Sequence, residues 1–164
     1  MRRSNLKKCR GFSLIEMVIV VVITALIGAI AIPKMSRGAA GAGDSALIQD
    51  LSILRSAIDL YQSENGGIYP TASNMPDVLL QYSDGNGNVS STNTAPFAYG
   101  PYLRAIPPLP VGVAKGSVGI AVLGGGPSTR PSATGWIYNV VTGKITANTK
   151  YTELDSKGIA YSAY

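Results

Sequence analysis

The feature that most constrains this chain is an apolar segment near its beginning, residues 12–32. Only Ser13, Glu16 and Thr24 among these 21 residues have clearly polar side chains. About 20 consecutive apolar residues form a helix long enough to cross a hydrocarbon core roughly 30 Å thick. A charged side chain inside such a helix costs about 2.5–3.5 kcal/mol on insertion scales. The presence of Glu16 therefore indicates a functional role in which a partner group compensates its negative charge.

The net charge of +5 is concentrated before this segment. Five of the 14 basic residues precede Gly11, and the other nine are matched by nine acidic residues. The rest of the chain is therefore neutral, which removes the main support for nucleic-acid binding. Basic residues directly before an apolar helix instead predict a cytoplasmic N-terminus, with the C-terminal part carried across the inner membrane.

Cysteine and histidine usage limits the chemistry of the chain. Cys9 is the single cysteine, and there is no histidine. One cysteine excludes an intrachain disulfide and a cysteine-based zinc site. The absence of histidine removes the commonest general base and the commonest metal ligand. No other set of residues forms a catalytic constellation, so the sequence predicts a protein that is not an enzyme.

One long helix is predicted over residues 12–64. Its second part, with Asp44 as a candidate N-cap, carries an apolar face with spacings of four, three, four and three residues. This face consists of Leu47, Leu51, Leu54, Ile58 and Tyr61. Gly66 and Gly67 are predicted to end the helix. Only this second part needs a folded domain to pack against.

Two features inside this helix disfavour a regular backbone. Pro33 is predicted to kink or interrupt the helix, because it lacks an N–H group and clashes with the preceding turn. The stretch 38–43 contains three glycines, which lower helix propensity. We interpret this stretch as a soft point or a close-packing patch.

Shorter elements are predicted after residue 67. They are a short helix within 75–82, a polar loop over 83–94, an irregular connection over 95–115, and strands at 119–123, 136–141 and 144–148. The last two strands flank Thr142-Gly143 as a hairpin. A helix followed by strands predicts an α+β fold, in which the long helix packs on a small antiparallel β-sheet.

The N-terminal motif resembles that of a known family. Gly11-Phe12-Ser13-Leu14-Ile15-Glu16 follows a basic leader and precedes an apolar run and Pro33. This arrangement resembles the class III signal of type IV pilins and of type II secretion pseudopilins. The resemblance implies a pilin-like fold with a leader at 1–11, a transmembrane and filament-core helix at 12–33, an amphipathic continuation at 34–67 and a globular periplasmic part at 68–164.

The resemblance also implies how the N-terminus is processed and used. A prepilin peptidase would cleave after Gly11 and methylate the new amino group of Phe12. A glycine suits this position because a small, flexible residue lets the backbone enter the intramembrane active site in extended form. Glu16 would pair with the charged amino group of a neighbouring subunit. The alternative is that Glu16 lies at the cytoplasmic interface and reaches lipid head groups.

Later segments resemble the major pseudopilin subgroup, at residues 67–71, 99–103 and 135–139. The Asp-Pro-Trp-Gly segment typical of that subgroup is replaced here by residues 107–112. The subgroup also implies a calcium site in the C-terminal loops. Glu153 and Asp155 are the nearest acidic residues, but neither is assigned as a ligand, so no metal ligand and no other cofactor is predicted.

Three further patterns are given structural interpretations. Residues 84–88 are a polar turn, because an EF-hand loop needs glycine and glutamate where this chain has Val89 and Ala95. Residues 124–127 lack the lysine and the helix of a phosphate-binding loop. The aromatic residues after the helix are interpreted as core or subunit contacts rather than as a binding platform.

The leading functional hypothesis is a structural subunit of a type II secretion filament. By resemblance, it is stored in the inner membrane as a single-pass protein and extracted into a periplasmic homo-oligomeric filament that supports protein export. The implied partners are the prepilin peptidase, minor pseudopilins and an ATP-driven inner-membrane platform.

Three alternatives remain. The first is a type IV pilus subunit for adhesion, motility or DNA uptake, which the lack of a C-terminal disulfide disfavours. The second is an exported enzyme or binding domain with an ordinary signal peptide, for which Ala29-Ile30-Ala31 offers a cleavage site. The third is an anchored protein that never polymerises, for which Glu16→Ala has no effect.

Overall fold

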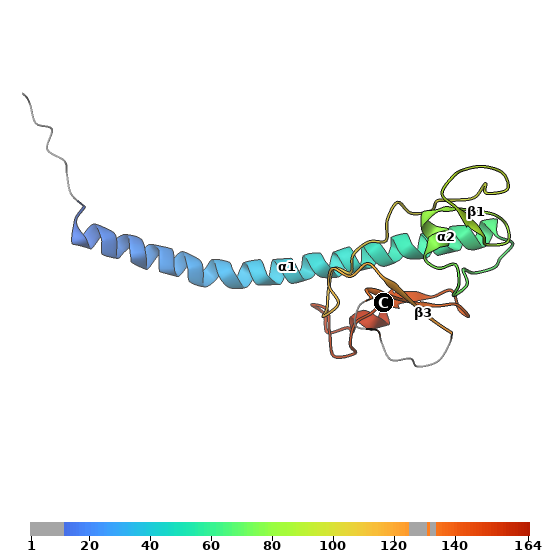
Figure 1. Ribbon diagram of the computed structural model, residues 1–164. Coiled ribbons are helices and arrows are strands. Elements are labelled where there is room, and N and C mark those ends of the chain that lie inside the picture. The colour runs from blue at the N-terminus through green and yellow to red at the C-terminus, as the bar shows by residue number, and fades with distance from the viewer. Residues whose placement is uncertain (1–11, 125–130, 132–133) are drawn as a thin grey trace, which may run out of the picture. The chain divides into compact units, whose positions relative to one another are not determined.

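The computed structural model describes residues 12–124, 131 and 134–164. The chain divides into two compact units, Met1–Ala39 and Ala40–Tyr164. Helix α1, Leu14–Glu64, contributes to both units (Figure 1). The predicted helix over 12–64 is therefore confirmed, with a start two residues later.

In the first unit the described residues belong almost entirely to α1. The helix continues through Pro33 and through the glycine-rich stretch 38–43. The predicted interruption at Pro33 is wrong. Each further residue of the helix adds one hydrogen bond, and together these bonds compensate for the single N–H group that proline lacks. A kink at Pro33 stays a prediction. Gly43, which already belongs to the second unit, supports the close-packing interpretation, since a Cβ there would lie 3.1 Å from Cγ1 of Val111 in the same unit.

In the second unit the later part of α1 buries its apolar face. Each of the five residues predicted for this face is at most 3% exposed: Leu47, Leu51, Leu54, Ile58 and Tyr61. The helix ends as predicted, because Gly66 and Gly67 adopt φ angles of 66° and 84° that favour glycine. The N–H group of Gly67 donates to the carbonyl oxygen of Gln62 at 2.8 Å.

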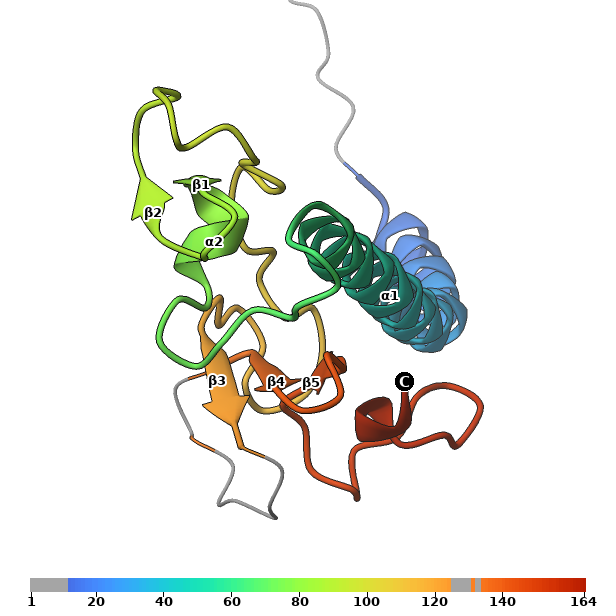
Figure 2. The same cartoon turned by 90° about the vertical axis from the view of Figure 1, so that its right-hand side faces the viewer.

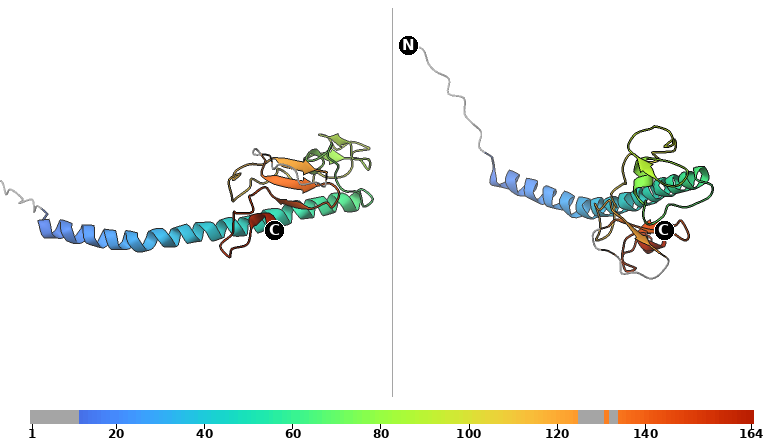
Figure 3. Two further views of the ribbon diagram at one scale, coloured as in Figure 1. Left: turned by 90° about the horizontal axis from the view of Figure 1, so that it is seen from below. Right: turned by 45° about the vertical axis from the view of Figure 1, so that its right-hand side comes forward.

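Short helices and two small sheets complete this unit (Figures 2 and 3). The elements are α2 (Asp77–Leu80), β1 (Tyr82–Ser83), β2 (Val89–Ser90), β3 (Ile120–Leu123), β4 (Trp136–Asn139), β5 (Ile145–Ala147) and the 3₁₀ helix η1 (Tyr161–Ala163). β1 and β2 pair antiparallel, and the other strands form a sheet in the order β3-β4-β5. The predicted α+β, pilin-like fold class is confirmed.

The three-stranded sheet is mixed. β4 and β5 pair antiparallel around Thr142-Gly143, as predicted. β3 and β4 pair parallel, with Ala121 opposite Ile137, so the antiparallel prediction is wrong for this pair. A parallel pair needs a crossover connection of about a dozen residues, and residues 124–135 supply that length.

The hairpin of β1 and β2 was not predicted. It lies in the predicted polar loop 83–94, except that β1 begins one residue earlier, at Tyr82, the last residue of the predicted short helix. Its turn is held by the Asp84 carboxylate, which accepts hydrogen bonds from the backbone N–H groups of Asn86 at 2.9 Å and Asn88 at 2.8 Å. These bonds confirm the polar-turn interpretation of residues 84–88. The strands have two residues each, which is too short for an alternating pattern to be recognised.

The core of the second unit lies between α1 and the three-stranded sheet, which runs alongside the teal and green part of α1 (Figure 3). Trp136 and Tyr138 are fully buried there. The Trp136 indole donates to the Pro107 carbonyl oxygen at 2.8 Å, and the Tyr138 hydroxyl to that of Pro70 at 3.1 Å. The interpretation of these aromatic residues as core is confirmed.

Candidate functional site

The first candidate site is the surface of α1 over Leu14–Ile32. This segment has a mean hydropathy of 2.8, and none of it is buried. Its length and composition are sufficient for crossing a membrane. The absence of burial argues against the interior helix of a soluble domain. A cleavable signal sequence has the same properties, so the residues at the start of the helix must decide between them.

The helix begins with one half of a capping box, the hydrogen bond from the Ser13 backbone to the Glu16 side chain. The backbone N–H group of Ser13 donates to Oε2 of Glu16 at 3.3 Å. The N–H group of Glu16 in turn donates to the carbonyl oxygen of Ser13 at 3.1 Å. Serine before a helix with glutamate three residues later is the recognised sequence signature of this cap. The sequence carried that signal, and we missed it.

Glu16 is also the single charged residue of Leu14–Ile32. The other polar side chain there, Thr24, is satisfied within the helix, because its hydroxyl donates to the carbonyl oxygens of Val20 and Val21 at 2.9 and 3.0 Å. Among the described residues, no cation lies within ion-pair distance of Glu16. Its charge therefore lacks an ionic partner within this part of the chain.

The other predicted N-terminal residues lie at the same end of α1 or outside the described part. Phe12 is 77% exposed and precedes Glu16 by about one helical turn. Gly11 and the leader lie outside the described residues. The structure thus brings Phe12 and Glu16 to one end of the helix, where the helix dipole favours the carboxylate.

A second polar site, in the second unit, surrounds Asp44. Its carboxylate accepts hydrogen bonds from the backbone N–H group of Ser156 at 2.9 Å and from the Tyr161 hydroxyl at 2.8 Å. The hydrogen bonds from Ser156 hold the pKa of Asp44 below its ordinary value. The N-cap prediction for Asp44 is wrong, because α1 is continuous there and the buried side chain contacts the C-terminal segment instead.

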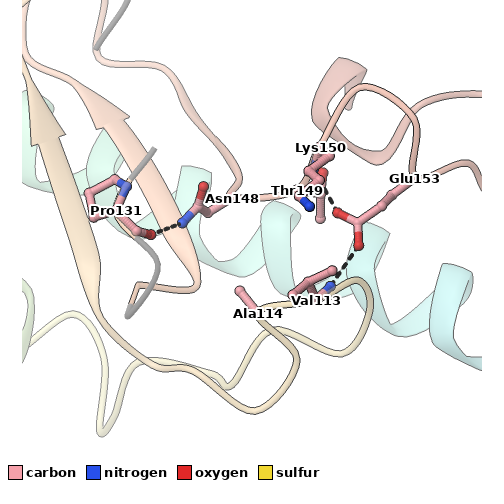
Figure 4. Close-up of a pocket in the computed structure, with 7 residues that line it drawn as sticks. All are labelled: Val113, Ala114, Pro131, Asn148, Thr149, Lys150 and Glu153. Carbon is pink, nitrogen blue, oxygen red and sulfur yellow. Dashed lines mark hydrogen bonds between the residues drawn. The ribbon is translucent and has the colours of Figure 1, made fainter. Parts of the chain in front are cut away.

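The two acidic residues nearest the implied calcium site are occupied by donors from the chain itself. The Glu153 carboxylate accepts bonds from the N–H groups of Val113 at 2.7 Å and Lys150 at 2.6 Å, on one side of a small pocket (Figure 4). The Asp155 carboxylate accepts from the N–H groups of Lys157 at 2.8 Å and Ile159 at 2.7 Å. Within the described part of the chain, no three acidic, cysteine or histidine residues converge on a metal position.

Comparison with known proteins agrees with the N-terminal motif. Residues 6–32 match the model of the prokaryotic N-terminal methylation motif. The architecture is pilin-like. The match covers the residues proposed for cleavage, methylation and pairing, including Gly11, Phe12 and Glu16.

The similarity of this chain to known proteins extends beyond the motif. It is 27% identical over 110 residues to the type II secretion system core protein G of Vibrio cholerae, covering 66% of this chain and 69% of that protein. It is 27% identical over 107 residues to the core protein G of Klebsiella pneumoniae, covering 65% and 72%. The core protein G of Aeromonas hydrophila is 26% identical over 102 residues, covering 62% and 67%. No solved structure matches the chain.

Proposed function

We propose that the chain is a pseudopilin, a structural subunit that polymerises into a periplasmic filament of a type II secretion system and supports protein export across the outer membrane. One observation carries the proposal. A prepilin-type N-terminus begins an apolar helix surface that the chain itself leaves unburied. The similarity to three core protein G sequences over about two thirds of the chain favours the secretion system over a type IV pilus.

Processing creates the second charge of the assembly contact. Cleavage after Gly11 and methylation of Phe12 leave a positively charged amine one helical turn before Glu16. Within one chain this carboxylate caps the helix by accepting from Ser13 N–H. Between chains it neutralises the Phe12 amine of a neighbour, because an unpaired charge is costly once apolar helices exclude water.

The same segment anchors the subunit before assembly. The five basic residues before Gly11 hold the leader on the cytoplasmic side, so the globular part is periplasmic. Transfer from lipid into a bundle of like helices keeps Leu14–Ile32 in an apolar environment. An ATP-driven inner-membrane platform supplies the work of extraction, and minor pseudopilins take part in assembly. The subunit presents surfaces and performs no chemistry.

The intact mass of the protein extracted from membranes tests the processing step. We expect a chain that begins at a methylated Phe12. A chain that begins at Ile32 would contradict the proposal, because cleavage after Ala29-Ile30-Ala31 is the product of an ordinary signal peptidase. A mass that still includes Met1 would show that the motif is not processed.

Deletion of the gene separates the secretion filament from a surface pilus. We expect extracellular enzymes to accumulate in the periplasm while surface fibres remain. Loss of surface fibres with unchanged export would overturn the secretion assignment and support a type IV pilus. Restoring the wild-type gene controls for effects on neighbouring genes.

A further inference from the structure

The last part of the chain is tied to α1 at two places in the second unit. Asp44 accepts hydrogen bonds from Ser156 N–H and the Tyr161 hydroxyl at 2.9 and 2.8 Å. The Arg55 guanidinium donates to the carbonyl oxygen of Tyr164. Asp44 and Arg55 are about 16 Å apart along the helix axis at a rise of 1.5 Å per residue. The C-terminal segment is therefore fixed along three turns of α1.

Asp155 closes the C-terminal segment on itself. Its Oδ1 atom accepts from two backbone N–H groups, those of Lys157 and Ile159, and its Oδ2 atom accepts from the Tyr164 hydroxyl. The side chain is 9% exposed. Asp44, Asp155, Tyr161 and Tyr164 together form what we call the C-terminal clasp, two carboxylates that each accept a tyrosine hydroxyl.

These carboxylates do not fit the calcium ion that the family resemblance implies. Calcium takes six to eight oxygen ligands at about 2.3–2.6 Å. The carboxylates of Asp44, Glu153 and Asp155 instead accept seven hydrogen bonds, five of them from backbone N–H groups. An N–H group presents the positive end of its dipole, which attracts a carboxylate and repels a cation. The donor set suits bare carboxylates rather than carboxylates bound to a metal.

We propose that the C-terminal clasp closes the C-terminal segment onto α1 in place of a calcium ion, so that the second unit folds and remains stable without calcium. A carboxylate that accepts several hydrogen bonds is satisfied without a counter-ion when the donors are well placed. The clasp provides such donors from both the backbone and the tyrosines. This inference does not depend on the secretion assignment.

The test uses the full-length processed protein in detergent, with thermal unfolding followed by the fluorescence of Trp136. This residue is the single tryptophan of the chain and is fully buried in the second unit, so its signal reports on that unit. We expect the same unfolding midpoint with excess EGTA and with added calcium chloride. A midpoint that rises with calcium and falls with EGTA would overturn the proposal.

Two variants test the clasp itself. Tyr161→Phe and Tyr164→Phe each remove one hydroxyl that donates to a carboxylate, and each should lower the midpoint by roughly 4–10 °C. A phenol hydroxyl is not among the usual calcium ligands, so a metal-closed loop would not show this loss. Asp155→Asn should lower the midpoint further, with no recovery in calcium.

The matched control is Asp59→Asn, an exposed carboxylate on α1 outside the clasp. Its midpoint should equal that of the wild type. If both tyrosine variants unfold at the wild-type midpoint, the clasp does not hold the segment and the proposal fails. If Asp155→Asn does not fold, the two tyrosine variants still test the proposal, because each of them loses only one hydroxyl group.

Discussion

Removing the charge of Glu16 while keeping its hydrogen bond separates the cap that it forms from the pairing proposed for it. In Glu16→Gln the side-chain oxygen can still accept from Ser13 N–H, which lies 3.3 Å from Oε2 in the wild type. Glutamine serves as well as glutamate at this position of a capping box. If Glu16 pairs with a neighbour's Phe12 amine in the dry filament interior, loss of the charge costs about 3–5 kcal/mol per contact. The association constant per subunit then falls by roughly 100-fold to several thousandfold.

If Glu16 only caps the helix, the variants should rank differently in filament assembly. A side-chain cap and the attraction of a carboxylate to the helix dipole contribute only about 1 kcal/mol. Glu16→Ala would lose this contribution and Glu16→Gln would keep most of it. A cap therefore predicts glutamine close to wild type, whereas an ion pair predicts that glutamine and alanine fail to a similar extent.

The assay measures how much subunit enters filaments. Cells produce each variant at the same level, filaments are separated from inner membranes, and the subunit is quantified in both fractions. Intact masses must show that the leader was removed from every variant. Thr24→Val is the matched control, because its hydroxyl bonds only within its own helix, and it should assemble normally. Wild-type assembly of Glu16→Gln would refute the ion-pair argument.

Two further predictions concern the second unit, both measured as free energy or midpoint of unfolding. Gly143→Ala should destabilise the second unit by about 2–5 kcal/mol, because Gly143 has φ 68° and a Cβ there would overlap the Tyr69 ring. The control is Gly85→Ala, which should be nearly neutral because a Cβ at Gly85 meets open space. The free energy of unfolding should also be constant over an intermediate pH range and fall on both the acid and the alkaline side. A tyrosine hydroxyl and backbone donors lower the pKa of Asp155 from about 3.8, so its contribution is complete above that value and is lost as the pH falls through the folded-state pKa. Burial and the bond to a carboxylate raise the pKa of Tyr161 from 10.0 to about 12, so its contribution is complete below pH 10 and is lost as the pH rises toward 12.

The parts of the fold predicted correctly are those that short-range patterns encode. The apolar run, the buried face around Leu54 and the glycines after Glu64 each depend on residues within a few helical turns. The same holds for the hairpin at Thr142-Gly143. The hydrogen bond between Ser13 and Glu16 is equally local, and the Ser-x-x-Glu pattern encodes it.

The features that were predicted wrongly depend on contacts distant in sequence. Asp44 resembled a helix start because aspartate is a common N-cap, yet its partners Ser156 and Tyr161 lie more than 110 residues later. The parallel pairing of β3 and β4 joins residues 16 positions apart, such as Ile120 and Trp136, and strand patterns do not encode the direction of such a pairing. In both cases a local preference was overridden by tertiary packing.

The amino-acid sequence is sufficient to place an apolar helix with a single acid, Glu16, over residues 14–32, because an apolar run acts through local chemistry and solvent. The roles proposed for Gly11, Phe12 and Glu16 rest on the sequence motif alone. The contacts that hold the C-terminal segment become visible only in the folded chain. Three of the hydrogen bonds to its carboxylates and to Asp44 of α1 join residues at least 40 positions apart, those from Val113 to Glu153 and from Ser156 and Tyr161 to Asp44. A carboxylate accepts hydrogen bonds or binds a metal ion according to whether backbone N–H groups or carbonyl oxygens lie next to it. The folding of the chain sets that geometry.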